Sequence, residues 1–181
     1  MKTALESCIC RISCWPKRGE QQISLNCRTF ASPWGNEDTQ TLIDILAQYD
    51  VKTTFFVVGD WAEKYPESVK ALHDAGHEVM SHSNHHDHYN SLSTQQLIDD
   101  VTARNQRISA STGVTPTLIR CPYGEDDDLV SAAIRSLGME PIQWDVDSLD
   151  WKDYDAETIC KRVTSKVQPG SIVLFHNAAL H

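Results

Sequence analysis

Two hydrophobic periods alternate along the chain from residue 39 to residue 176. Runs of β-branched and aromatic residues, of which residues 53–58 are the clearest, are typical of buried strands. Between these runs, apolar residues recur three and four positions apart, which is typical of helices that bury one face. The pattern predicts strands at residues 53–58, 77–81, 117–120, 141–146 and 171–176.

Capping residues and helix breakers mark the ends of the predicted helices. Ser93 and Gln96 have the spacing of a capping box, and Pro66 can occupy the first turn of a helix that ends at Gly76. The predicted helices begin near residues 39, 66, 94, 127 and 155. Their inward-facing residues are expected to be Leu42, Ile45, Leu46 and Tyr49; Val69 and Leu72; Leu97, Val101 and Ile108; Leu129, Ala133 and Leu137; and Ile159 and Val163.

Strands that alternate with helices predict a parallel sheet covered by helices, so the expected fold class is α/β. An open, doubly wound sheet and a closed barrel both fit this pattern. In either architecture, the chemistry lies at the carboxyl ends of the strands. His82, Arg120, Asp147 and His176 occupy those ends. These four polar residues are therefore the first candidates for a functional site.

Length and composition narrow the class of protein. The 181 residues suit one domain, and 40% hydrophobic with 23% charged residues is an ordinary globular mixture. Sixteen Lys and Arg against 25 Asp and Glu leave a formal charge of −9, which disfavours general nucleic-acid binding. No apolar run is long enough for a membrane span or a signal peptide, so we expect a cytoplasmic chain or one that has lost its leader. The oligomeric state is not predicted.

Four of the six cysteines lie close to the N-terminus, at Cys8, Cys10, Cys14 and Cys27. Their spacing differs from the paired Cys-x-x-Cys units that zinc modules use. Free thiols in a poorly ordered arm, disulfides and a zinc site are three interpretations that the spacing leaves open.

The densest polar feature follows the predicted strand at residues 77–81 and reads Ser-His-Ser-Asn-His-His-Asp-His. Within it, His82 and His86 lie four residues apart, so they would share one face of a helical turn, as metal-binding histidines do in other motifs. Two imidazoles suit zinc or another divalent transition metal. The alternative is a solvated polar loop that is rich in histidine.

Three further clusters follow the ends of predicted strands. Arg120 begins the sequence Arg-Cys-Pro-Tyr-Gly, in which an arginine suited to carboxylate binding precedes a rigid turn whose N–H groups could face an oxyanion. Residues 144–151 combine aspartates with two tryptophans, which suits an orienting carboxylate beside a sugar platform. His176 leaves a buried strand and is a candidate acid or base. Taken singly, these clusters also fit an ordinary turn, an acidic capping loop and a buried histidine.

In this order the clusters resemble the motifs of the polysaccharide deacetylases, the NodB-homology family of metal-dependent carbohydrate N-deacetylases (carbohydrate esterase family four). The resemblance implies an irregular (β/α) barrel of about seven strands, from which the C-terminal strand and helix would be missing here. We expect residues 34–181 to form this truncated domain, after a divergent N-terminal arm and first strand at residues 1–33. The matching segments are residues 34–39, 53–59 and 76–78, His-Ser-x-x-His at 82–86, Arg-x-Pro-Tyr-Gly at 120–124, Asp-Ser-x-Asp-Trp at 147–151 and Leu-x-His at 174–176.

The resemblance implies which residues bind metal and substrate. His82 and His86 would hold a divalent metal, usually zinc, which polarises the acetamide carbonyl and lowers the pKa of its bound water. The backbone N–H of Tyr123 would help to hold the oxyanion. Trp151 and Leu174 would form the walls of the pocket for the acetyl methyl group.

The resemblance also implies an acid and a base. His176 would protonate the leaving amine, with Asp147 as its orienting carboxylate and Asp150 as the second candidate for that role. Arg120 would steady the carboxylate that acts as the base. The family's first motif reads Thr-Phe-Asp-Asp or a close variant. When this chain is aligned on Trp-Gly at residues 34–35, Ala31 stands at the base position and Ser32 at the metal-ligand position.

A metal-dependent N-deacetylase that acts on N-acetylated amino sugars of peptidoglycan or a chitin-like glycan is the function that the resemblance implies. We expect its activity to be impaired because Ala31 replaces the base. The alternatives are a non-catalytic carbohydrate- or metal-binding relative and a related amidohydrolase on a small cyclic amide. The family resemblance implies a protein of the cell envelope or a secreted protein. A shifted reading frame upstream of residue 34 and true divergence both fit residues 1–33.

Overall fold

The protein contains one parallel sheet of seven strands, in the order β5-β4-β3-β2-β1-β7-β6. The computed structural model describes residues 28–32, 35–152 and 154–177. The longer strands are β1 (Arg28–Ser32), β2 (Thr54–Val57), β3 (Glu78–Ser81) and β7 (Val173–His176). The short ones are β4 (Leu118–Ile119), β5 (Glu140–Pro141) and β6 (Val146–Asp147).

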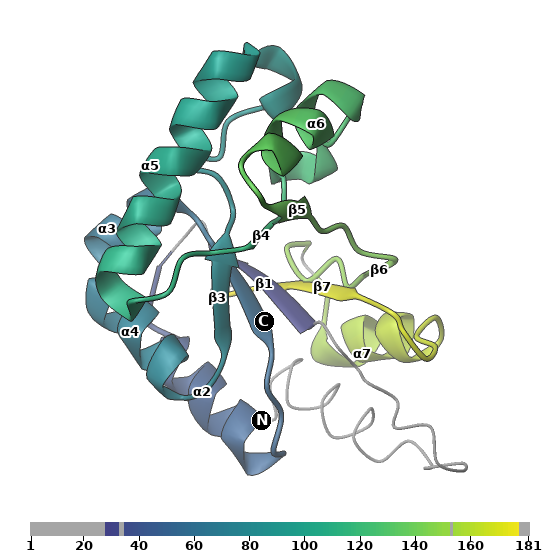
Figure 1. Cartoon of the computed structure of the whole chain (residues 1–181). Coiled ribbons are helices and arrows are strands. Elements are labelled where there is room, and N and C mark those ends of the chain that lie inside the picture. Colours follow the sequence, from purple (N-terminus) through teal and green to yellow (C-terminus); the bar gives the residue numbers. More distant parts are fainter. Residues whose placement is uncertain (1–27, 33–34, 153, 178–181) are drawn as a thin grey trace.

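Helices connect the strands and cover the sheet. Figure 1 shows α2, α3, α4 and α5 along one flank, α7 beside β7, and α6 near β5. The helices are α2 (Thr39–Gln48), α3 (Gly59–Lys64), α4 (Pro66–Asp74), α5 (Thr94–Thr112), α6 (Asp128–Ser136) and α7 (Ala156–Thr164), with short 3₁₀ turns at Tyr89–Ser91 and Pro122–Gly124. Within the described ranges, no helix has the length and apolar character needed to cross a membrane.

The predicted helix ends are confirmed where the sequence carries capping chemistry. Ser93 accepts a hydrogen bond from the Gln96 N–H, and the Gln96 side chain accepts one from the Ser93 N–H, so the capping box is complete. Asp127 and Asp155 cap α6 and α7 with their carboxylates. Gly113 ends α5 with φ of 74°, a left-handed conformation that glycine adopts at little cost.

Two hydrophobic clusters stabilise the sheet and its helices. The larger one packs residues of β2 and β7 against α2, α3, α4 and α7, and Leu46, Val57, Val69 and Val163 in it are fully buried. The smaller one joins α5 and α6 to β4 through residues such as Val101, Ile119 and Ile134. Each large apolar side chain that is fully buried stabilises the folded protein by about 1.5–3 kcal/mol. The carboxyl ends of β3, β4 and β7 are thereby held in fixed relative positions.

The sheet is strongly curved. Its two outermost strands, β5 and β6, are joined by only residues 142–145, although they lie at opposite ends of the strand order. A flat sheet of seven strands would separate its edges by roughly 29 Å, whereas five Cα–Cα steps reach at most about 19 Å. The curvature agrees with the irregular barrel that the family resemblance implies. No ladder joins β5 to β6 among the described residues.

Two local predictions are wrong, and one helix was not predicted. The strand predicted at residues 141–146 is two strands, because β5 pairs with β4 and β6 pairs with β7 across the curved sheet. Leu129 is 77% exposed, since the cap at Asp127 turns Val130 and Ile134 of α6 inward instead. Helix α3 was not predicted, because its six residues are too few to show a hydrophobic period.

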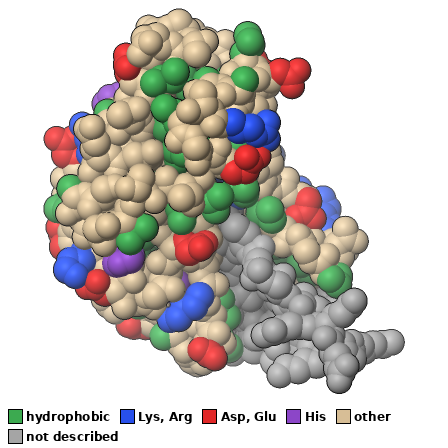
Figure 2. All heavy atoms as spheres, in the orientation of Figure 1, with side chains coloured by type: hydrophobic (Ala, Val, Ile, Leu, Met, Phe, Trp, Pro, Cys, Tyr) green, Lys and Arg blue, Asp and Glu red, His purple; other side chains and the backbone are tan. Residues whose placement is uncertain are grey.

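Two other expectations concern the surface and the cysteines. Figure 2 shows acidic and basic side chains scattered over the described part of one face, rather than gathered into a basic patch. Cys121 and Cys160 are buried free thiols. The interpretations of Cys8, Cys10, Cys14 and Cys27 fall outside the described residues.

Candidate active site

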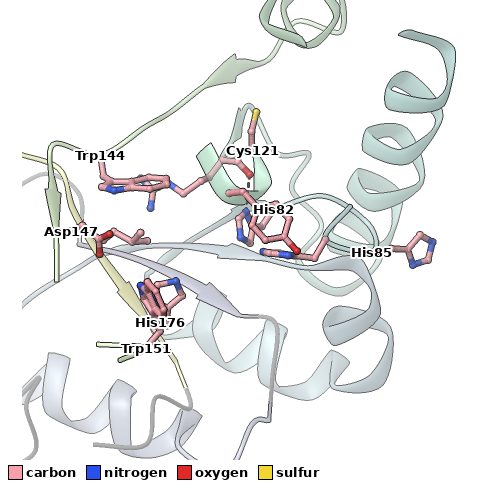
Figure 3. Close-up of a pocket in the computed structure, with 11 residues that line it drawn as sticks. His82, His85, Cys121, Trp144, Asp147, Trp151 and His176 are labelled. Atoms are coloured by element: carbon pink, nitrogen blue, oxygen red, sulfur yellow. Dashed lines mark hydrogen bonds between the residues drawn. The ribbon is translucent and has the colours of Figure 1, made fainter. Parts of the chain in front are cut away.

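A pocket of about 820 Å³ opens at the carboxyl ends of the strands and contains all eight predicted site residues (Figure 3). They come from segments that are far apart in the sequence and meet because parallel strands end at the same edge of a sheet. The lining consists of His82, His85, His86, Arg120, Cys121, Tyr123, Trp144, Asp147, Trp151, Leu174 and His176.

His82 directly follows β3 and is held as a neutral imidazole. Its Nδ1–H donates to the carbonyl oxygen of Arg120 at 2.7 Å, which leaves the lone pair of Nε2 available to a ligand. The side chain is 3% exposed. Burial, assisted by the nearby charges of His86 and Arg120, lowers the pKa of His82 to about 3.

His86 stands close to His82 on a tight loop rather than on the helical turn that the spacing suggested. The two ring centroids are 5.0 Å apart, and the rings are nearly perpendicular. Ser83 and His86 both have positive φ, 67° and 62°, and the His86 N–H donates to Ser83 Oγ at 2.8 Å. Burial and the proximity of His176 lower the pKa of His86, so this imidazole is also neutral near pH 7.

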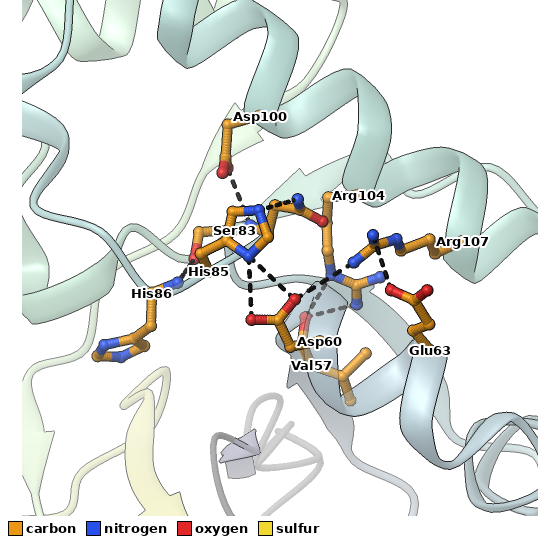
Figure 4. A network of polar contacts seen from close by, with 10 residues as sticks. Val57, Asp60, Glu63, Ser83, His85, His86, Asp100, Arg104 and Arg107 are labelled. Carbon is orange, nitrogen blue, oxygen red and sulfur yellow. Dashed lines mark hydrogen bonds and ion pairs between the residues drawn. The ribbon is translucent and has the colours of Figure 1, made fainter.

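Neighbouring helices hold the loop that carries these histidines. The N–H groups of Gly59 and Asp60, at the start of α3, donate to the carbonyl oxygens of Ser83 and Asn84. From α5, the Asp100 carboxylate accepts the Asn84 N–H at 2.9 Å (Figure 4). The loop is therefore fixed from two sides before any ligand binds.

A buried arginine of α5 supports the strand behind the loop. Arg104 is fully buried, and its Nε and Nη2 both donate to the carbonyl oxygen of Val57 (Figure 4). The same carbonyl accepts the backbone N–H of His82 at 3.0 Å. Burial lowers the pKa of Arg104 to about 9, so the guanidinium is still protonated near pH 7.

The imidazoles of His85 and His88 pair with carboxylates away from His82 and His86. His85 lines the pocket, but its ring points away from the other lining residues (Figure 3), and its Nδ1 pairs with Asp60 of α3. That hydrogen bond raises the pKa of His85. His88 Nδ1 pairs with Glu125 Oε1 at 2.7 Å.

The residues present supply only part of a catalytic metal site. Catalytic zinc sites usually have three protein ligands, whereas the described residues contain no cluster of three or more His, Cys, Asp or Glu that could hold a metal ion. His82 and His86 provide two imidazoles. At the end of β1, the backbone of Ala31 lies beside Phe56 and His176, and that of Ser32 beside Val57. Neither residue is a carboxylate, so the ligand set is incomplete.

Arg120 is buried, with 1% exposure, and binds the segment that crosses from β5 to β6. Its Nε donates to the carbonyl oxygen of Ile142 at 3.2 Å, and its Nη2 donates to that of Gln143 at 3.1 Å. The guanidinium also lies over the rings of Phe56 and Trp144, with its carbon 4.5 and 5.4 Å from their centroids. Arg120 therefore helps to hold one wall of the pocket.

Tyr123 occupies the turn after β4 with φ of 58° and ψ of 5°. No described residue accepts a hydrogen bond from its backbone N–H. Its ring meets the edge of His86 at a centroid distance of 4.7 Å and stacks on His88 at 4.0 Å. The turn therefore leaves this N–H without a protein acceptor among the described residues, on a residue whose ring packs against His86 and His88.

His176 is held by Asp150, which corrects the prediction of Asp147 as its partner. The Asp150 carboxylate accepts two hydrogen bonds of 2.7 Å, one from the Nδ1–H of His176 and one from its backbone N–H. Asp147 lines the pocket, but its carboxylate accepts the Leu149 N–H at 2.9 Å. Leu149 has φ of 57°, and this reversal brings Asp150 rather than Asp147 to the histidine.

The apolar lining contains the predicted walls and one further tryptophan. Leu174 is 5% exposed, whereas Trp151 is 52% exposed and stands at the rim of the pocket. The sequence predicted Trp144 only as part of an acidic and aromatic loop. In the structure it lines the pocket, and its ring lies against the guanidinium of Arg120. An apolar pocket beside the His176–Asp150 pair and an N–H donor without a protein acceptor suits a small acyl group.

The comparisons with known proteins identify the family. A family model described as polysaccharide deacetylase matches residues 22–142. The chain belongs to the polysaccharide deacetylase family. One relative of this chain is a peptidoglycan-N-acetylglucosamine deacetylase of Bacillus cereus, which is 33% identical over 143 residues. The alignment covers 78% of this chain and 51% of the relative, so the chain spans about half of that protein.

Solved structures confirm the family fold. A family 4 carbohydrate esterase from Streptomyces lividans, in complex with acetate, matches with a TM-score of 0.78 and 32% identity, over 83% of this chain and 78% of that one. A mutant of a family 4 pseudoenzyme from Bacillus anthracis, described as having restored enzymatic activity, matches with a TM-score of 0.81 and 34% identity, over 83% and 56% of the two chains. The predicted family and α/β fold are therefore confirmed.

Proposed function

We propose that the pocket binds an N-acetylated amino sugar of a glycan such as peptidoglycan or a chitin-like polymer, and hydrolyses its acetamide slowly. The observation that carries this proposal is an asymmetry in the site. A complete acid pair, His176 with Asp150, lies at one side. Beside it, the end of β1 carries Ala31 and Ser32 in place of the two carboxylates of the family. A glycan of this kind lies in the cell envelope, and we propose that location for the protein.

His176 is the proposed acid. Asp150 accepts the Nδ1–H, so Nε2 is the nitrogen through which a protonated His176 would donate to the leaving amine. The Asp150 carboxylate would stabilise the imidazolium before that transfer. The family contains deacetylases of peptidoglycan, among them the Bacillus cereus relative.

The remaining pocket residues would orient the substrate. The free N–H of Tyr123 suits the oxygen of the acetamide as negative charge develops on it. Leu174 and Trp151 suit the acetyl methyl group and the sugar ring. Arg120, which binds the carbonyl oxygens of Ile142 and Gln143, would keep the wall of the pocket in place.

His82 and His86 are proposed to bind a divalent metal, zinc in the first instance. The Nε2 lone pair of His82 and the adjacent ring of His86 support this assignment. Two imidazoles without a carboxylate would bind the metal more weakly than a full set of three ligands.

A non-catalytic glycan-binding role is the second candidate, and a specific observation favours it. Ala31 and Ser32 stand where the family's first motif has two aspartates, so the chain lacks both of these carboxylates. One of the solved structures that it matches is a pseudoenzyme of the same family. In this case the pocket would bind the N-acetylated sugar without hydrolysing it.

The deciding experiment measures acetate release from N-acetylglucosamine oligomers at a fixed zinc concentration. The wild type, Ala31→Asp, Ser32→Asp and the double variant are compared. A positioned general base contributes about 10²–10⁴-fold, so the double variant is expected to exceed the wild type by that order. Ser32→Asp alone should raise the zinc affinity, measured by calorimetry.

Each result separates the two candidates. A wild type that already matches the double variant would show that Ala31 causes no defect, and Glu37 or Asp38 would become the candidate base. A wild type that binds the oligomers but releases no acetate would favour the non-catalytic role, even if the double variant is active. A wild type that neither binds nor hydrolyses the oligomers would contradict both.

A further inference from the structure

The turn at Tyr123 needs something to hold it. Its φ of 58° lies in the left-handed region, which residues other than glycine, asparagine and aspartate rarely adopt. Tyr123 is 58% exposed, so burial of its ring does not fix the conformation. A turn of this kind persists only where its surroundings determine it.

Two side chains close a ring of contacts around Tyr123. His88 stacks on the tyrosine ring, with centroids 4.0 Å apart and an interplanar angle of 11°. The Nδ1 of His88 pairs with Glu125 Oε1 at 2.7 Å, and Glu125 lies two residues after Tyr123. The other oxygen of Glu125 accepts the Asn90 N–H at 3.4 Å. The imidazole is thus oriented by the same turn on which it packs.

We propose that His88 and Glu125 are positioning residues that hold the left-handed turn, so that the Tyr123 N–H stays directed at the substrate oxygen. The inference rests on the proposed function, because it assigns Tyr123 as the donor to that oxygen. His88 touches neither substrate nor metal in this role and acts through the ring of Tyr123.

The exposure of these residues separates positioning from simple structural support. The side chain of His88 is 59% exposed and that of Glu125 is 24% exposed. The exposed His88 ring buries little apolar area, and Glu125→Gln nearly keeps the size of the Glu125 side chain, so these changes should alter the free energy of unfolding only slightly. Their consequence should appear in the geometry of the turn.

The same loop offers a matched control. His85 Nδ1 pairs with Asp60 at 2.9 Å, and the side chain of His85 is 53% exposed, close to the value for His88. Asp60 belongs to α3 and also pairs with Arg107 (Figure 4), whereas the ring of Tyr123 packs on His86 and His88. Asp60→Asn and Glu125→Gln therefore make the same chemical change in two histidine–carboxylate pairs, only one of which adjoins the turn.

The first test is kinetic and uses the full chain with Ala31→Asp and Ser32→Asp, at saturating zinc. His88→Ala is expected to lower kcat about two- to tenfold, the range that a stacked aromatic pair is worth, while KM and zinc affinity stay within about twofold. His88→Phe keeps the flat ring and should recover most of kcat. Glu125→Gln should lower kcat less than His88→Ala, and Asp60→Asn, which keeps the backbone N–H that binds Asn84, should lower it less than Glu125→Gln.

The second test does not depend on turnover. This test uses ¹⁵N-labelled protein that keeps Ala31 and Ser32, and it follows the amide resonance of Tyr123 by NMR. His88→Ala should shift this resonance and reduce the change that added acetate causes in it, whereas Asp60→Asn should do neither. Equal effects of the two changes, or a loss of kcat that follows a loss of zinc affinity, would overturn the proposal. If the restored chain released no acetate, the proposed function would fail, and the Tyr123 resonance would still decide whether His88 holds the turn.

Discussion

Asp150→Asn removes the negative charge beside His176 while nearly keeping the size of the side chain. Asp150 is 5% exposed, and its two oxygens each accept a hydrogen bond of 2.7 Å, from the Nδ1–H and the backbone N–H of His176. An asparagine has one acceptor oxygen and one NH₂ group. One of the two donors of His176 would therefore face another donor.

The cost follows from these two bonds. Hydrogen bonds to a charged group contribute about 1.5–3 kcal/mol each, and a buried donor left without an acceptor costs about 1–3 kcal/mol. We expect Asp150→Asn to lower the free energy of unfolding by about 2–4 kcal/mol. In the chain with restored carboxylates, loss of the group that orients the acid should lower kcat by about 10²-fold or more.

Asp147→Asn is the matched control for this change. The Asp147 carboxylate accepts one backbone N–H, from Leu149 at 2.9 Å, and the oxygen of an asparagine can accept it as well. Its cost should stay below about 1 kcal/mol. Urea unfolding followed by tryptophan fluorescence measures stability, and acetate release measures kcat. If Asp147→Asn lost as much stability and kcat as Asp150→Asn, the assignment of Asp150 would be wrong.

Three further predictions follow from the site and the core. Burial lowers the pKa of His77 to about 4, below its unfolded value near 6.5, so stability should fall by up to about 3 kcal/mol as the pH drops from 6.5 to 4. His77→Asn keeps an acceptor for the Thr53 N–H, and its free energy of unfolding in urea should fall less steeply with decreasing pH than that of the wild type. An equally steep fall in both proteins would show that His77 does not cause the pH dependence. Gly59→Ala would place a Cβ 2.9 Å from the backbone of Asn84. The change should lower the free energy of unfolding, measured in urea, by about 1–3 kcal/mol and should weaken zinc binding. An unchanged free energy of unfolding would contradict this contact. His82→Ala should abolish zinc binding at the pocket in calorimetry, and retained binding there would disprove the proposed ligand.

Local chemistry explains which parts of the fold were predictable. The capping box at Ser93 and the caps at Asp127 and Asp155 act within four residues of themselves, so sequence spacing alone locates α5, α6 and α7. The split of residues 141–146 into β5 and β6 has a different cause. It depends on which strand lies at each edge of a curved sheet, and no local pattern in those residues records that.

The site shows the same division between motif and backbone. Strand ends predicted that His82, Arg120, Asp147 and His176 would meet, and the motif spacing and the family resemblance added the other four; all eight candidates line one pocket. The error at Asp147 arose because only the left-handed turn at Leu149 decides which aspartate reaches His176. Ser83, His86 and Tyr123 share this conformation. Serine and tyrosine seldom adopt positive φ, so propensity argues against the turns at Ser83 and Tyr123. Tertiary contacts, such as the hydrogen bonds from α3 to the loop of Ser83, fix such turns, and local sequence does not record them, which is why Asp150 was identified as the partner of His176 from the structure.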